Sequence, residues 1–100
     1  MNPLNPGIQL ALSRTAFTNN KIEEAKDYAN AALSLKADYI DAFIVLSQIA
    51  KSEGNNSSAL SYAEKALALA PTNKDLIQYV NSLKGISSSN TNANTSASGN

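Results

Sequence analysis

The chain repeats itself with a period of 34 residues, and this period constrains its fold more than any other feature. When residues 6–39 are aligned with residues 40–73 without a gap, nine positions are identical. These are Leu12/Leu46, Ser13/Ser47, Ala16/Ala50, Ala25/Ala59, Tyr28/Tyr62, Ala29/Ala63, Ala32/Ala66, Leu33/Leu67 and Leu35/Leu69. Nearly all are apolar or small residues at helical spacing, as expected when one helix pair occurs twice and the two copies stack.

The composition favours helices that pack closely on one another. Hydrophobic residues make up 43% of the 100 residues, but many are alanine and only 6% of the chain is aromatic. Alanine is the strongest helix former and lets helix backbones approach closely. We therefore predict an all-α fold of antiparallel helix hairpins, five helices in all, stacked as an α-solenoid.

Polar residues typical of helix caps lie at the expected helix ends. Asn5 and Pro6 are typical of an N-cap and a first helical residue, and the first helix is expected to end at Thr18. We predict that Asn20 caps the second helix, with Glu23 completing a capping box. Its buried face is expected to carry Ile22, Ala25, Ala29, Ala32, Leu33 and Leu35.

The second half of the chain has similar capping residues at its expected helix ends. The expected N-caps are Asp38 for the third helix, Asn56 or Ser57 for the fourth and Thr72, with Asp75, for the fifth. Gly54 is expected to adopt a left-handed conformation after the third helix, the fourth is expected to end at Leu69, and Gly85 is expected to end the fifth. The predicted organisation is a lead-in over 1–5, repeats over 6–39 and 40–73, a capping helix over 74–85 and a disordered Ser/Asn-rich tail over 86–100.

Charge and residue types exclude several functions. Eight basic and eight acidic residues cancel, and neither sign forms a block, so we expect no nucleic-acid partner. The absence of His and Cys argues against His-based catalysis and thiolate metal sites. Glu23, Glu24 and Asp27 could hold a hard cation, but Lys21 and Lys26 among them favour a solvated helix face. We therefore expect no enzyme activity, no cofactor and no metal.

Membrane insertion and export are not expected either. The longest apolar runs have five residues, against roughly 20 needed to span a bilayer. The first residues carry no positive charge ahead of an apolar run, so they do not form a signal peptide. We predict a cytoplasmic protein.

The period and its residues resemble the tetratricopeptide repeat family. In the second repeat the matching residues are Phe43, Leu46, Ser47, Gly54, Ala59, Ala66 and Pro71, and in the first they are Leu12, Ser13, Ala25 and Ala32. Alanine replaces large family residues at Ala16, Ala29, Ala50 and Ala63. We expect Phe17, Tyr28, Tyr39 and Tyr62 to fill part of the resulting space.

The resemblance implies a concave groove formed by the first helix of each pair, which binds a peptide or a helix of a partner protein. By this resemblance the groove is lined by Leu10, Arg14, Phe17, Asp41, Ile44, Gln48, Lys51 and Gln78. The alternative for Leu10, Phe17 and Ile44 is a place in the core.

A structural role is the alternative to a binding module. Ile8 and Leu12 have no preceding repeat to cover them, so the chain could form a homodimer or the C-terminal end of a longer array. The chain also resembles the repeat tails that follow the membrane domain in some bacterial polysaccharide-ligase-like proteins.

Overall fold

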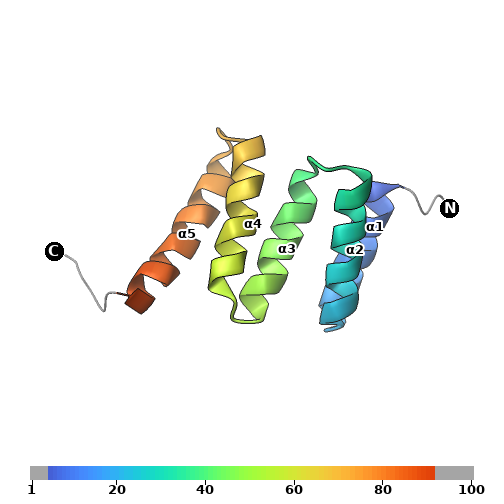
Figure 1. Cartoon of the computed structure of the whole chain (residues 1–100), viewed down its shortest axis with the longest axis horizontal. Coiled ribbons are helices and arrows are strands. Elements are labelled where there is room, and N and C mark those ends of the chain that lie inside the picture. Colours follow the sequence, from blue (N-terminus) through green and yellow to red (C-terminus); the bar gives the residue numbers. More distant parts are fainter. Residues whose placement is uncertain (1–4, 92–100) are drawn as a thin grey trace.

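The computed structural model describes residues 5–91, with side chains for residues 5–85. Within this range the chain forms five α-helices and no strand, which confirms the all-α prediction. They are α1 (Pro6–Thr18), α2 (Ile22–Leu35), α3 (Ile40–Ser52), α4 (Asn56–Leu69) and α5 (Lys74–Thr91). Figure 1 shows them in chain order, with α1 at one end of the molecule and α5 at the other.

The helices form two hairpins and a single final helix. Helix α1 packs along α2 and α3 packs along α4, while α2 and α1 both contact α3. Helix α5 packs on α4. The second hairpin therefore lies between the first hairpin and α5, which makes the molecule a short helical-hairpin solenoid.

Asn5 begins α1 as predicted. Its side-chain Oδ1 accepts hydrogen bonds from the backbone N–H groups of Gly7 at 2.7 Å and Ile8 at 3.4 Å. Pro6 occupies the first helical position, where its missing N–H costs no hydrogen bond. The start and end of α1 are both as expected.

Three of the other expected caps are displaced by one residue. The side chains of Asn55 and Asn73 accept hydrogen bonds from the backbone N–H three residues on, at 3.3 and 3.2 Å. The Tyr39 side chain makes no such bond. The corrected N-caps are Tyr39 in place of Asp38, Asn55 in place of Asn56 or Ser57, and Asn73 in place of Thr72.

The turn within each hairpin contains a left-handed residue. Gly54 has a φ of 79°, as predicted, and Asn20 at the same repeat position has a φ of 63°. The backbone N–H of Asn20 bonds to the carbonyl of Phe17, and the next N–H, that of Lys21, bonds to Ala16 at 2.8 Å. This pattern closes the end of α1. The prediction that Asn20 caps α2 is therefore wrong, and Lys21 stands at the N-cap without a side-chain cap bond.

The prediction that α5 ends at Gly85 is wrong, because the helix continues to Thr91. One glycine costs a helix only about 1 kcal/mol relative to alanine, which is too little to terminate it by itself. Residues 86–91 therefore belong to α5 rather than to the predicted disordered tail. The rest of that predicted tail, residues 92–100, lies outside the described residues.

The core consists largely of alanine faces with aromatic residues at their edges. Three alanines of α2 and three of α4 are fully buried: Ala25, Ala29, Ala32, Ala59, Ala63 and Ala66. Phe17, Tyr28, Tyr39 and Tyr62 pack half-buried against this core, as expected. Leu35, which was expected on the buried face of α2, is 39% exposed instead.

A buried serine joins the two helices of each hairpin. Ser13 Oγ donates to the carbonyl of Ala25 at 2.6 Å, and Ser47 Oγ donates to the carbonyl of Ala59 at 2.7 Å. Both hydroxyls are fully buried, so these bonds satisfy groups that would otherwise be costly to bury. The small serine and alanine side chains also let the helices approach closely.

Candidate functional site

The structure divides the predicted groove residues between core and surface. Leu10 is only 2% exposed and belongs to the core, so its predicted place in the groove is wrong. Phe17 is half-buried and packs against the same core, whereas Ile44 is half-buried at the surface of α3 and lines a hollow there. The exposed members are Arg14, Asp41, Gln48, Lys51 and Gln78.

A hollow of about 270 Å³ lies between α3 and the beginning of α5, and we call it the α3–α5 hollow. Ile44, Leu76 and Tyr79 supply its large apolar surface, and polar groups stand beside them. The complete lining is Ile44, Gln48, Asn73, Asp75, Leu76 and Tyr79. Of the residues predicted for the groove, it contains Ile44 and Gln48.

Helix spacing explains why Leu10 and Ile44 differ although they occupy the same repeat position. Helices α1 and α3 approach closely, whereas no described Cα of α5 comes within 8 Å of a Cα of α3. The side chain of Leu10 is therefore covered, and that of Ile44 faces an open gap. Larger side chains on α5 agree with the wider spacing, because Leu76 and Tyr79 stand where α3 has Ala42 and Val45.

The side chain of Tyr79 reaches from α5 to α3. Tyr79 was not among the residues predicted for the groove. Its hydroxyl lies 2.9 Å from Ser47 Oγ. Since Ser47 has one proton and donates it to the carbonyl of Ala59, Tyr79 must be the donor to Ser47. The result is a chain of two hydrogen bonds that ties α5 to the second hairpin. The available signal was a tyrosine at the position where the earlier repeats carry Ala11 and Val45.

A second hollow, of about 480 Å³, adjoins the first. We call it the acidic hollow; it lies at the turn between α2 and α3, and Asn73 lines both. Its lining is Lys36, Asp38, Tyr39, Ile40, Asp41 and Asn73. The ammonium of Lys36 lies 6.0 Å from the centre of the Tyr39 ring.

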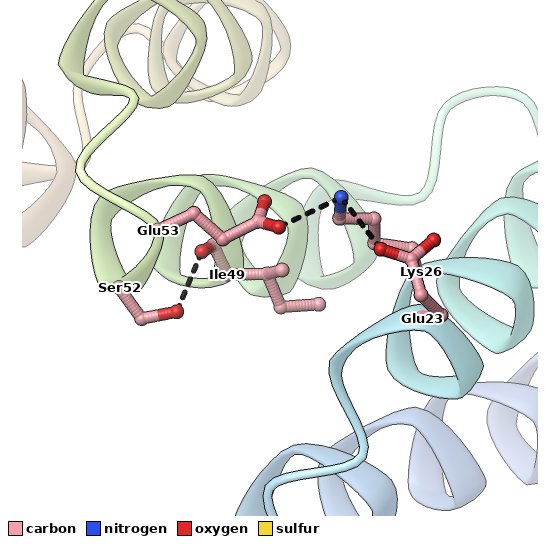
Figure 2. A network of polar contacts seen from close by, with 5 residues as sticks. All are labelled: Glu23, Lys26, Ile49, Ser52 and Glu53. Carbon is pink, nitrogen blue, oxygen red and sulfur yellow. Dashed lines mark hydrogen bonds and ion pairs between the residues drawn. The ribbon is translucent and has the colours of Figure 1, made fainter.

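An ion pair connects the two hairpins on another side of the molecule. Figure 2 shows Lys26 between two carboxylates, with Nζ 2.9 Å from Glu53 and 3.4 Å from Glu23. The hydrogen bond to Glu53 raises the pKa of Lys26, partial burial lowers it, and the nearby negative charges raise it further. The pKa lies above the ordinary value because the charged ammonium is held by both carboxylates, and a neutral amine would lose that charge attraction. Lys26 and Glu53 also line a smaller hollow of about 130 Å³.

The outer face of α1 is the open end of the stack. Leu12 is 38% exposed, whereas Leu46 at the same position in the next repeat is 3% exposed. Ile8 is half-buried, whereas its counterpart Ala42 is fully buried. The first hairpin covers this face of α3, and no described residue covers it on α1.

Residue types common in catalytic and metal sites are few in this chain. The chain has no His or Cys, and within residues 5–91 no group of acidic residues is arranged to hold a metal ion. Among the same residues no helix is long and apolar enough to cross a membrane.

Comparison with known families agrees with the architecture. No curated protein is significantly similar to the chain. The family model described as "Tetratricopeptide repeat" matches residues 6–39 and 40–73, which is more than half of the chain. These segments correspond to the hairpins α1–α2 and α3–α4 with the turns that follow them. Such repeats are generally protein–protein interaction modules and are typically not catalysts. The chain therefore belongs to the tetratricopeptide repeat family.

Proposed function

We propose that this protein binds a peptide or a helix of a partner protein in the groove along α1, α3 and α5, without catalysing a reaction. The α3–α5 hollow carries the proposal, because it is an apolar recess at the surface with polar groups beside it. Recognition sites commonly combine such a recess with a few polar groups that orient the ligand.

The size of the hollow suits one large side chain. Its volume of about 270 Å³ exceeds the cavity of about 150 Å³ that accommodates benzene in a protein core. Ile44 and the ring of Tyr79 would contact such an anchor, and Leu76 forms the floor at 4% exposure. An apolar anchor in a pocket is the type of contact that dominates interface energies.

Polar groups at the edge of the hollow can hold the rest of the ligand. The amide of Gln48 can both donate and accept hydrogen bonds, as a peptide backbone requires, and the amide of Asn73, whose oxygen caps α5, can donate. Arg14, Lys51 and Gln78 are exposed on the same three helices and could contact the flanking parts of a longer ligand. Of the residues predicted for the groove, the proposed site keeps Arg14, Asp41, Ile44, Gln48, Lys51 and Gln78. It omits Leu10, which is in the core, and Phe17, which packs against the core.

Selection from a displayed library of random peptides tests the proposal, with the folded protein as bait. Ile44→Asn should weaken binding of the enriched peptides more than about tenfold, because it removes the apolar wall of the hollow. Ser61→Asn, on the exposed face of α4, is the matched control and should leave binding unchanged. Circular dichroism checks that both variants are folded.

Two results would contradict the proposal. One is a library that yields no bound peptide although the bait is folded. The other is a set of enriched peptides that bind the folded Ile44→Asn variant as well as they bind the parent.

Self-association through α1 is a second candidate function. Its support is the difference in exposure between Leu12, at 38%, and Leu46, at 3%. The same repeat position is buried where a neighbouring hairpin packs against it. The face around Leu12 contains Ile8, Ala11 and Thr15 and no charged residue, so two copies could place it against itself without charge repulsion.

A further inference from the structure

Three carboxylates line the α3–α5 hollow and the acidic hollow beside it. Asp75 lines the hollow itself, and Asp38 and Asp41 line the acidic hollow that adjoins it at Asn73. All three side chains are exposed, and none forms an ion pair within 4.0 Å among the described side chains. These negative charges are therefore available to a ligand.

Helical spacing places one of these charges next to the apolar anchor site. Asp41, Ile44 and Gln48 are related as i, i+3 and i+7, so they share one face of α3. Asp75 immediately precedes Leu76 in the first turn of α5. A ligand side chain seated against Ile44 and Leu76 would thus have a carboxylate within one helical turn on each helix.

Within the lining of the two hollows, positive charge does not cancel these carboxylates. Lys36 is the one basic residue in the described lining of either hollow. The N-termini of α3 and α5 add about half a positive charge each. Lys74, which lies between Asn73 and Asp75 in the sequence, is exposed and lines neither hollow, and the same is true of Arg14 and Lys51. The lining of the two adjoining hollows therefore carries a net negative charge, with Asp75 at the apolar recess and Asp38 and Asp41 beside it.

We infer that the groove selects a peptide in which a lysine or arginine lies close to a large apolar anchor residue. The inference rests on the proposed function, because it describes the ligand of the same hollow. The anchor enters the α3–α5 hollow, and its basic neighbour pairs with Asp41 or Asp75. An arginine can donate two parallel hydrogen bonds to one carboxylate, which adds geometric specificity to charge attraction.

The same displayed library tests the inference when the bait's charges are changed. Peptides enriched on the parent should carry lysine or arginine beside a large apolar residue more often than the starting library does. A synthetic copy of an enriched peptide should bind Asp41→Asn/Asp75→Asn more than about tenfold more weakly, and its binding to the parent should weaken as salt is added.

A matched double variant separates local pairing from net charge. Asp27→Asn/Glu64→Gln removes two negative charges from exposed positions on α2 and α4 and should bind the peptide as the parent does. The charge reversal Asp41→Lys/Asp75→Lys should shift selection toward peptides with acidic residues beside the anchor.

The outcomes distinguish this inference from the function on which it rests. Peptides that depend on Ile44 but carry no basic excess, or that bind Asp41→Asn/Asp75→Asn unchanged, would overturn the inference and leave the groove as the binding site. Peptides that bind the folded Ile44→Asn variant as well as the parent would overturn the proposed function and the inference with it. Basic peptides weakened equally by both double variants would indicate attraction to net charge and would also overturn the inference.

Discussion

At the residue scale, Asn20 and Gly54 show how one backbone requirement is met by two different side chains. Both stand at the same repeat position and both have positive φ, at 63° and 79°. Glycine adopts this conformation without steric cost, and asparagine tolerates it better than most residues do. The turn geometry is therefore a property of the repeat rather than of the amino acid.

Substitution at these turns should change stability in opposite directions. Gly54→Ala should lower the free energy of unfolding by about 1 kcal/mol, because alanine is strained at positive φ. An added Cβ would meet no atom within 4 Å, so a steric clash does not contribute. Asn20→Gly should raise the free energy of unfolding by up to about 1 kcal/mol. Urea denaturation followed by circular dichroism measures both.

Gly85 provides the control for this pair. It lies inside α5 without positive φ, and an added Cβ there also meets nothing within 4 Å. Gly85→Ala should therefore stabilise the protein by about 0.5–1 kcal/mol through helix propensity. A Gly54→Ala variant that gained stability as Gly85→Ala does would show that the turn is not strained by a side chain.

At the scale of helices, each hairpin depends on a close contact between a serine and an alanine. Ser47 donates to the carbonyl of Ala59, and Ala59 itself is fully buried. The first hairpin repeats the arrangement with Ser13 and Ala25. The contact between the two helices is close, but it buries little apolar area because the alanine side chain is small.

Ala59→Leu should therefore destabilise the protein by about 1–3 kcal/mol, because added methylene groups overpack a contact that has no spare volume. Ala68→Leu is the control, since Ala68 lies on the exposed side of the same helix. Thermal unfolding compares the two variants. Equal losses of stability would mean that α3 and α4 are not held together at Ala59.

At the scale of the whole molecule, the two ends of the stack differ. Leu46 in α3 is 3% exposed and Val80, at the same position of α5, is 2% exposed, whereas Leu12 in α1 is 38% exposed. Helix α5 places this face against the preceding hairpin, and α1 has no described neighbour to cover it. The open face of α1 is consequently the second candidate interface.

If two copies associate through α1, Leu12→Lys should weaken dimerisation by at least about tenfold, because a charge would be buried at the centre of the contact. Sedimentation velocity over a range of concentrations measures the change. Ile77→Lys is the matched control, since Ile77 is 37% exposed on α5 at the other end. A parent protein that remains monomeric throughout, or a dimer unaffected by Leu12→Lys, would contradict self-association through this face.

The sequence by itself determined the helical class and the period of this protein, and it placed the helix starts to within one or two residues. These properties follow from local chemistry: alternation of small and polar residues at helical spacing, Asn5 with Pro6 at one helix start, and Gly54 at one turn. Where several capping residues stand together, as at Thr72 and Asn73, local reasoning predicted the cap but displaced it by one residue. The end of α5 was mispredicted because the cost of Gly85 is small compared with the energies that continue a helix.

Only the tertiary structure decided which surface residues can meet a ligand. Leu10 and Ile44 occupy one repeat position and have nearly the same chemistry, yet one is core and the other lines a hollow. The α3–α5 hollow likewise joins Gln48 to Asn73, Asp75 and Tyr79, which lie far apart in the sequence. The physical reason is that burial depends on the distance between neighbouring helices. That distance is set by packing across the whole stack, which the pattern within one helix does not contain.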